Sequence, residues 1–249
     1  MTTPTLQGAA QGTTQASNQV LGLPSLGQVT RASIADQVFG ALQQKILSLE
    51  LPPGTKLSEV DVATQMDVSR QPVRDAFYRL SQLGFLLIRP QRATVVSLIS
   101  EAAVLRAQFI RTALETETCR TACKTLTPKD FAVLQELLDG QQKASDTMEK
   151  KLFHALDDQF HREICTRAGL GFAWDLIHES KSHMDRVRML SLDKSSEIAL
   201  NEHREILAAM IARDGDATAE AMRRHLARIR GFLAEIKAKN HQWFTEGAE

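Results

Sequence analysis

The chain contains 249 residues, and its 30 lysines and arginines balance 30 aspartates and glutamates, so a polyanionic partner would have to be bound by a local basic patch. With 43% hydrophobic and 24% charged residues, the composition is that of an ordinary folded protein and excludes wholesale disorder. No run approaches the ~18 apolar residues that a membrane span requires, and the first residues lack the basic start and apolar run of a signal peptide, so we expect a cytoplasmic protein with no membrane partner.

The first thirty residues differ from the rest of the chain because they contain no charged side chain. They consist largely of Thr, Gln, Gly, Ala, Ser and Pro. Such a composition buries too little apolar surface to offset the loss of conformational entropy on ordering. We therefore predict a disordered tail over residues 1–30.

Three helices are predicted after this tail. The first covers about residues 34–46, where apolar residues recur at helical spacing, and it ends before Pro52. The second begins after Ser58, whose hydroxyl can cap the helix, with Asp61 three residues later as in a capping box. The third begins after Ser69, which offers a second cap. Its buried face is predicted by an apolar stripe, formed by Val73, Ala76, Phe77 and Leu80.

A short hairpin is predicted after the third helix. Residues 85–88 and 94–96 are β-type runs that flank the sequence Arg89-Pro90-Gln91-Arg92. Three helices followed by a hairpin, which would form the wing, is the order of a winged helix-turn-helix domain. We assign this domain to residues 31–98.

The start of the third helix is expected to contact DNA. In a helix-turn-helix, the first turn of the second motif helix meets base edges, and nearby hydroxyls and amides hold phosphates. Arg70 and Arg74 lie one turn apart, and either can donate two hydrogen bonds to guanine, whereas Gln71 can pair with adenine. From residue 70 to residue 92 the chain has five arginines and one acid, Asp75. A solvated helix face would explain the spacing, but not the caps, the turn and the basic hairpin that accompany it.

Beyond residue 98 the pattern is helical and shows no strand signal. Pro128 after Thr127, glycines at positions 169 and 171, and the sequence Asp214-Gly215-Asp216 mark helix ends. We predict a mainly α protein whose residues 99–249 form an all-α antiparallel bundle. Its six helices are expected at about residues 101–125, 128–145, 151–167, 172–190, 200–213 and 217–240. The three cysteines are odd in number, and we expect them to be reduced and structural.

A metal site is predicted within this helical region. Asp157 and His161 are four residues apart, so their side chains project from one helix face. His203 and His225 stand beside apolar residues of later helices and are candidates to point inward. One carboxylate and three imidazoles suit a divalent metal, with zinc favoured and nickel or manganese as alternatives. Each histidine alone could equally be a surface or core residue, and the Asp–His pair could be a helix-surface interaction. The histidines at 154, 178, 183 and 241 are interpreted as structural or exposed.

Two arginines are candidates for binding an effector. Arg111 shares a helical stripe with Val104 and Leu114, and Arg188 shares one with apolar residues of its own helix. If they face a cavity that also holds the metal, a small organic acid would fit, because its carboxylate can fill open coordination positions and an arginine can balance its charge. A surface salt bridge is the alternative for each arginine.

Two segments resemble known families. The sequences Leu51-Pro52-Pro53-Gly54-Thr55-Lys56-Leu57-Ser58-Glu59 and Val68-Ser69-Arg70-Gln71-Pro72-Val73-Arg74-Asp75-Ala76 are similar to the signature of GntR-type bacterial transcription regulators. The sequence Asp157-Asp158-Gln159-Phe160-His161, with the two later histidines, is similar to the metal-binding pattern of the FCD ligand domain in the FadR branch of that family. The resemblance implies a winged helix-turn-helix followed by an effector domain. It also implies that the operator is contacted by Ser69, Arg70, Gln71 and Arg74, with a wing that carries Arg89, Arg92 and Thr94.

These observations lead us to expect a homodimeric, ligand-responsive transcription regulator rather than an enzyme. Two copies would read the halves of a palindromic double-stranded operator, ~34–36 Å apart. The family's commonest mode is repression that is relieved by effector, here a small carboxylate. One alternative is a helical metal-dependent hydrolase, because an open metal position can activate water. Another is a constitutive DNA binder without an effector.

Overall fold

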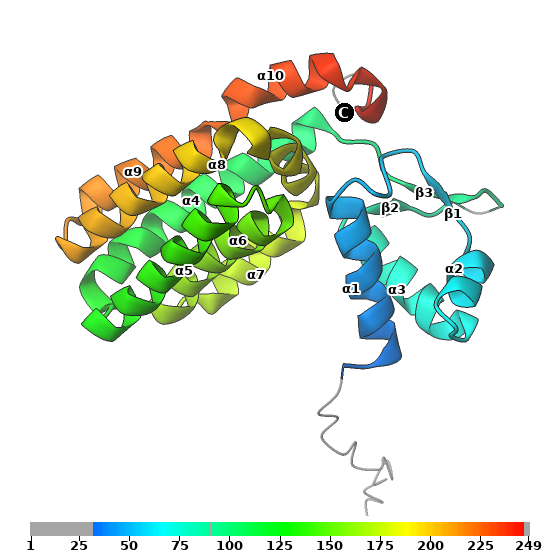
Figure 1. Cartoon of the computed structure of the whole chain (residues 1–249), viewed down its shortest axis with the longest axis horizontal. Helices are drawn as coiled ribbons and strands as arrows, with labels where there is room; N and C mark the ends of the chain where they lie inside the picture. The colour runs from blue at the N-terminus through cyan, green and yellow to red at the C-terminus, as the bar shows by residue number, and fades with distance from the viewer. Residues whose placement is uncertain (1–31, 90, 247–249) are drawn as a thin grey trace, which may run out of the picture. The chain divides into compact units, whose positions relative to one another are not determined.

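The computed structural model describes residues 32–89 and 91–246, and for residues 193 and 194 it describes the backbone alone (Figure 1). The predicted tail over residues 1–30 lies outside this part of the chain. Helices dominate from residue 34 onward, with one small sheet in the N-terminal region. The mainly α fold class predicted from the sequence is confirmed.

The N-terminal region contains three helices, α1 (Ile34–Leu47), α2 (Glu59–Gln65) and α3 (Arg70–Gln82). The first begins with a full capping box, in which Ser33 and Asp36 satisfy each other's backbone N–H groups. All four residues of the predicted apolar stripe of α3 are buried, and α3 packs against both α1 and α2. These contacts form the core of the three-helix unit.

The two predicted helix caps behave differently. The Ser58 hydroxyl accepts a hydrogen bond from the backbone N–H of Asp61 and caps α2 as predicted. Ser69 occupies the position before α3, but its hydroxyl makes no capping hydrogen bond, so that part of the prediction is wrong. The exposed Ser69 side chain therefore remains available for a different partner.

A three-stranded antiparallel sheet completes this region. The predicted hairpin is present as β2 (Leu86–Leu87) and β3 (Thr94–Val96), paired antiparallel. A further strand, β1 (Lys56–Leu57), pairs with the other edge of β3, so the order is β1-β3-β2. The sequence did not predict β1 because two residues are too few to show the alternation of a strand. Three helices with a hairpin extended by one strand form a winged helix-turn-helix.

The first helices of the C-terminal region match the predicted ranges. They are α4 (Glu101–Thr125), α5 (Pro128–Asp146) and α6 (Lys150–Arg167). Thr127 and Asp130 form a full capping box at the start of α5, with Pro128 at the first helical position, where its missing N–H costs nothing. Here α5 packs against α6, and α4 packs against α6 as well.

The remaining helices differ from the prediction. They are α7 (Gly171–Ser180), α8 (Ser182–Ile211), α9 (Gly215–Ala227) and α10 (Ile229–Lys239), followed by a 3₁₀ turn, η1 (His241–Trp243). The chain breaks at Lys181 rather than between residues 190 and 200, and the last predicted helix is interrupted at Arg228. The described part of this region therefore has seven α-helices, α4 to α10, instead of six.

Serine hydroxyls bond within α8 along a segment that lacks apolar periodicity. The Ser191 hydroxyl donates to the carbonyl of Arg188, and the Ser195 hydroxyl donates to the carbonyl of Ser191. Both bonds stay within the helix, so the polar side chains are satisfied without interrupting the backbone ladder. The polar sequence was therefore a misleading sign of a helix end.

The long helices of the C-terminal region lie alongside one another as a bundle (Figure 1). Its main apolar core is drawn from α4, α5, α6, α8 and α9. The three cysteines, Cys119, Cys123 and Cys165, are buried and form no disulfide with one another. None of the described helices combines the length and the apolar character that crossing a bilayer demands.

Candidate functional site

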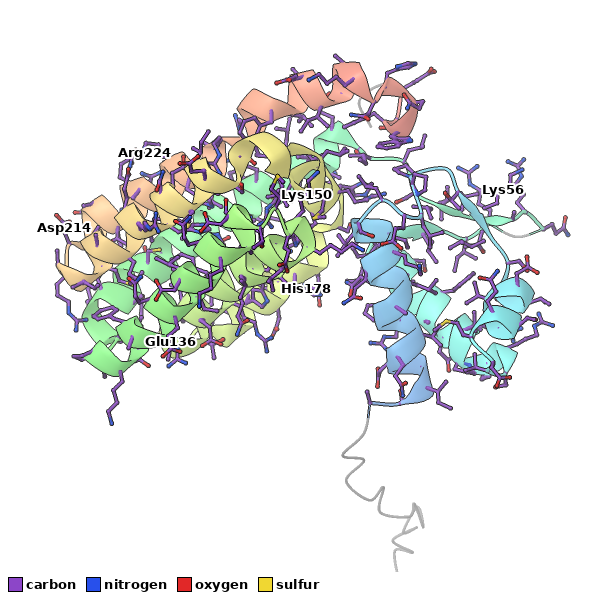
Figure 2. All side chains as sticks on the ribbon, viewed as in Figure 1. Lys56, Glu136, Lys150, His178, Asp214 and Arg224 are labelled. Carbon is purple, nitrogen blue, oxygen red and sulfur yellow. The ribbon has the colours of Figure 1, made fainter. Side chains whose placement is uncertain are left out.

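The structure brings the four predicted metal ligands together inside the helical bundle. Asp157 and His161 lie on one face of α6, His203 lies on α8, and His225 lies on α9. All four side chains are buried, and the most exposed of them, His225, retains only 8% of its accessible surface. Arg224, the residue before it, is exposed on the outer side of α9 (Figure 2). Helical spacing therefore turns the histidine, and not the arginine, into the bundle.

The potential ligand atoms face one another at short range. The Nε2 atoms of His203 and His225 are 3.3 Å apart. Carboxylate oxygens of Asp157 lie 3.8 Å from Nε2 of His161 and 3.7 Å from Nε2 of His203. One ring nitrogen of each histidine lies within 4.8 Å of the others. The three imidazoles thus converge, and the carboxylate lies beside two of them.

The opposite ring nitrogens are held by neighbouring acceptors. Nδ1 of His203 lies 2.8 Å from the side-chain oxygen of Gln141, and Nδ1 of His225 lies 2.8 Å from a carboxylate oxygen of Glu202. Because both partners offer an oxygen acceptor, Nδ1 carries the proton in each ring and Nε2 carries a lone pair. Nδ1 of His161 is 2.5 Å from Glu115, in an ion-pair contact rather than an aligned hydrogen bond.

This arrangement fits a divalent cation. Two lone pairs that face each other at 3.3 Å in a buried site repel unless a positive charge lies between them. Two nitrogen ligands bound at ~2.0–2.1 Å to a tetrahedral zinc ion would lie roughly 3.3 Å apart. Neither ring nitrogen of His161 has an aligned hydrogen-bond partner among the described residues. The separation and the donor set therefore both suit a metal ion bound by nitrogen and oxygen.

The electrostatic environment keeps His203, His225 and Asp157 free of protons. Burial lowers the pKa of His203 and of His225 well below the usual value of 6.5, so both are neutral at pH 7. Burial acts to raise the pKa of Asp157, but the nearby Arg188 guanidinium and the histidines outweigh it and hold this pKa well below 3.8. Neutral imidazoles and an ionised carboxylate are the forms that bind metals.

A second group of possible ligands lies beside this centre, formed by His154, Asp158 and Asp185. It already holds cations. The Lys181 ammonium lies 2.6 Å from both carboxylates, and Arg188 lies 2.8 Å from Asp158 and 3.2 Å from Asp185. We therefore interpret this group as a buried ion-pair network and not as a second metal site.

A cavity of about 50 Å³ opens next to the four predicted ligands. Three arginines line it, and each contacts a carboxylate: Arg111 lies 2.6 Å from Glu115, Arg188 contacts Asp157, and Arg228 contacts Glu202. The rest of its wall is mainly apolar, with two serines, and includes Met184, Leu192, Leu226, Ile229, Phe232, Ser191 and Ser195. The two arginines expected from the sequence to bind an effector thus both reach this cavity, already paired with acids.

The residues predicted to read DNA lie at the start of α3. Ser69, Arg70, Gln71 and Arg74 are all exposed, and they lie opposite the buried stripe of the helix. Both arginines approach one acid, because their Nη2 atoms lie 3.4 and 3.3 Å from the Glu59 carboxylate at the start of α2. The Gln71 amide donates to Asp75. Glu59 thus holds the guanidinium groups of Arg70 and Arg74 side by side on the exposed face of α3.

The hairpin between β2 and β3 carries the other predicted contacts. Arg89 and Arg92 are exposed, and Thr94 is half-buried at the start of β3. Lys56 on β1 is exposed on the same sheet and adds a cation that the sequence did not single out (Figure 2). Arg79, one of the five arginines counted in the local excess, pairs instead with Asp36 and lies over the Phe39 ring. Arg79 therefore stabilises the packing of α3 on α1.

Comparison with known proteins decides the family. Residues 34–96 match the pattern of the gntR family of bacterial regulatory proteins, and residues 107–228 match the FCD domain. Over 215 residues the chain is 38% identical to the HTH-type transcriptional repressor RspR of Escherichia coli, which covers 86% of this chain and 94% of that protein. The chain belongs to the GntR family. The GntR-type helix-turn-helix implies DNA binding, and the FCD domain implies an effector ligand.

Further relatives share this organisation. The chain is 29% identical to a probable D-xylose utilization operon transcriptional repressor of Paenarthrobacter nicotinovorans, over 80% of this chain and 88% of that one. Among solved structures, E. coli McbR/YncC superposes with a TM-score of 0.71 at 23% identity, covering 84% of this chain and 99% of the other. That likeness shows the same fold. Relatives described as regulators favour a GntR-family regulator over the metal-dependent hydrolase that the histidines alone would permit.

Sequence reasoning missed the residues that contact the Nδ1 atoms of the three histidines, namely Glu115, Gln141 and Glu202. For Glu202 the sequence offered one signal, because this residue directly precedes His203 and therefore lies at the level of the predicted ligands along α8. Glu115 and Gln141 have no comparable signal in the sequence, because their distance from a histidine depends on how α4 and α5 pack against α6 and α8.

Proposed function

We propose that this GntR-family protein belongs to the FadR branch and acts as a homodimeric repressor in the cytoplasm, released from its operator by a small organic acid bound at a metal site. The observation that carries the metal site is that one ring nitrogen from each of His161, His203 and His225 lies within 4.8 Å of the others in the buried bundle. The Asp157 carboxylate lies beside two of these rings. Zinc is the favoured ion, and nickel or manganese would also accept this donor set.

The cavity beside the metal site limits the size of the effector. A volume of about 50 Å³ is small against the ~300–1,000 Å³ of pockets that enclose drug-sized ligands. Its arginines and the metal position favour a carboxylate, which would replace water on the metal and compete with the resident acids for Arg111 and Arg188. The proposed effector is therefore a short acid rather than a long acyl compound.

The proposed DNA-bound form is a homodimer on a palindromic operator. Each copy would place the first turn of α3 in the major groove, with Arg70 and Arg74 directed to guanine, Gln71 to adenine and Ser69 to phosphate. Arg89, Arg92 and Thr94 of the hairpin would contact the adjacent groove or backbone. Effector binding need only shift the arrangement of the two recognition helices, by a coupling free energy of roughly 1–3 kcal/mol.

The metal site is tested by replacing His203 and His225 together with alanine and measuring bound metal in the purified protein by plasma mass spectrometry. We expect the double variant to lose its metal, and to lose the change in DNA affinity that short carboxylates cause, while it still binds DNA. The matched control is His178→Ala, because His178 is exposed on α7 (Figure 2). Equal metal content in the double variant and the unmodified protein would refute the site.

The effector is sought by a thermal-shift screen of short carboxylic acids on the metal-loaded protein. A ligand that binds only the folded state raises the melting temperature in proportion to the logarithm of its concentration. Any acid found in this way should alter the affinity for an operator that has been selected from random DNA. If no acid in the screen alters DNA affinity, the protein would be a constitutive DNA binder.

A further inference from the structure

Glu202 occupies a junction between the predicted metal site and the cavity. It precedes His203 on α8, yet its carboxylate lies 2.8 Å from Nδ1 of His225 on α9. The same carboxylate oxygen accepts a hydrogen bond from the guanidinium of Arg228. Arg228 and His225 both line the cavity. One acid thus connects a metal-site histidine with an arginine of the cavity wall.

A carboxylate in this position controls which nitrogen of the ring is free. When Nδ1 donates its hydrogen to an acceptor, Nε2 must carry the lone pair, and the ring is fixed in the orientation of that hydrogen bond. An anionic acceptor also makes the imidazole a stronger electron donor. Nε2 of His225 is the atom that faces Nε2 of His203 at 3.3 Å.

The three histidines differ in the partner that holds them. His203 is held by Gln141, a neutral amide that is fully buried. His161 has Glu115 nearby, but that carboxylate is bonded to Arg111 and is not aligned with the ring N–H. The carboxylate of Glu202, by contrast, is in an aligned hydrogen bond with Nδ1 of His225.

We propose that Glu202 is the positioning residue of this metal site. Its carboxylate keeps His225 in the form that presents Nε2 to the metal, and Arg228 keeps the carboxylate in place on the cavity side. Glu202 does not touch the metal itself. This inference rests on the proposed metal site, and it assigns a role to a residue outside the four predicted ligands.

The test compares variants that keep or remove the acceptor oxygen. Glu202→Ala and Glu202→Leu remove it, whereas Glu202→Gln retains one, as Gln141 does for His203. The control is Glu205→Gln, because Glu205 lies on the same helix and pairs with the exposed Arg224, away from the histidines. Zinc and cobalt dissociation constants are measured by competition with a chromogenic chelator, and the absorption spectrum of bound cobalt reports the geometry of its ligands.

We expect Glu202→Ala and Glu202→Leu to bind either metal roughly 10- to 100-fold more weakly, the usual effect of losing such a partner, and to show an altered cobalt spectrum. Glu202→Gln should recover most of the affinity, and Glu205→Gln should match the unmodified protein. If Glu202→Ala fails to fold by circular dichroism, the comparison of the Leu and Gln variants decides. Equal affinities and spectra for those two variants would overturn the inference.

The outcomes separate this inference from the proposed function. If the unmodified protein binds neither zinc nor cobalt, the metal site itself is refuted and the inference falls with it. If the unmodified protein binds metal and the acceptor-free variants bind it equally well, the metal site stands and only the role of Glu202 is refuted.

Discussion

The histidines of this protein include two kinds, which differ in whether Nδ1 donates or accepts a hydrogen bond. In His203 and His225, Nδ1 faces an oxygen acceptor, so the lone pair is on Nε2. In His183, Nδ1 is instead the acceptor, because it receives hydrogen bonds from the backbone N–H of Ser100, at the start of α4, and from the guanidinium of Arg186. His183 thus helps to hold α4 against α8, and the lone pair on its Nδ1 already accepts these hydrogen bonds.

We predict that His183 makes the protein less stable in acid. Burial, together with Arg186 and Arg106, lowers the pKa of His183 to about 3. In the unfolded chain its pKa is near 6.5, so between these values the unfolded state binds the additional proton. The stability that His183 contributes is therefore complete above pH 6.5 and falls by about 1 kcal/mol per unit as the pH drops toward 3.

Urea unfolding of the metal-free protein at pH 7.5 and pH 5.5 measures this effect. The variant His183→Asn keeps an acceptor oxygen but cannot take up a proton in this range. We expect its stability to fall by about 1 kcal/mol less than that of the unmodified protein between the two pH values. Identical losses in the two proteins would show that His183 is not the responsible group.

The sequence indicated which residues could bind a metal, but it did not indicate which neighbouring residues orient those ligands. The four-residue spacing of Asp157 and His161 places both on one face of α6 whatever the rest of the chain does. Joining them to His203 and His225 needed the resemblance to the FCD domain, because spacing within a helix says nothing about its neighbours. Gln141 and Glu115 could not be predicted, since their roles depend on packing between helices.

At the scale of elements, the N-terminal region was easier to predict than α8. Caps, stripes and stops indicate the ends of α1, α2 and α3 within a few residues, because each signal is local. In α8, the polar segment around Ser191 and Ser195 has the composition of a loop, yet α8 packs on α5 and α9 and the serine hydroxyls bond to carbonyls of the same helix. A tertiary effect overrides the local signal there.

The arginines in the first turn of α3 lead to a prediction about the affinity for operator and random DNA. Arg70 and Arg74 share the Glu59 carboxylate in the free protein. Arg70→Ala should cost roughly 1–3 kcal/mol on a selected operator and much less on random DNA, because it removes a base contact. Glu59→Gln should strengthen binding to both DNAs modestly at low salt, because it removes a negative charge close to the phosphates.

Fluorescence anisotropy over a range of salt concentrations measures both effects. Glu136→Gln is a suitable control for the change of charge, since Glu136 is exposed on α5 in the helical bundle (Figure 2). A loss of equal size on operator and random DNA would show that Arg70 contacts only the backbone.

At the scale of the whole molecule, exposed apolar side chains on two helices are candidates for the interface of the proposed homodimer. Phe109 on α4 retains 70% of its accessible surface, and Phe172 and Leu176 on α7 retain 62% and 51%. These two helices pack against each other in the bundle. Large exposed apolar residues on neighbouring elements are typical of protein interfaces.

We predict that replacing Phe109 and Phe172 together by glutamate converts the proposed homodimer into a monomer, because four charges would be buried when two such copies meet. Sedimentation velocity measures the change, and the metal content should stay the same. Met148→Glu, at an exposed position between α5 and α6, is the control. A double variant that remains dimeric would place the interface elsewhere on the molecule.

The charged groups around the cavity have a consequence for the charge of a ligand that binds there. The cluster joins four cationic and five anionic side chains, namely Arg111, Lys181, Arg188, Arg228, Glu115, Asp157, Asp158, Asp185 and Glu202. These nine side chains together carry one surplus negative charge, and a divalent ion at the proposed metal site would convert this to one surplus positive charge. A monovalent acid would then restore electroneutrality among these groups. For the proposed effector, this balance of charge favours a singly charged acid over a dianion.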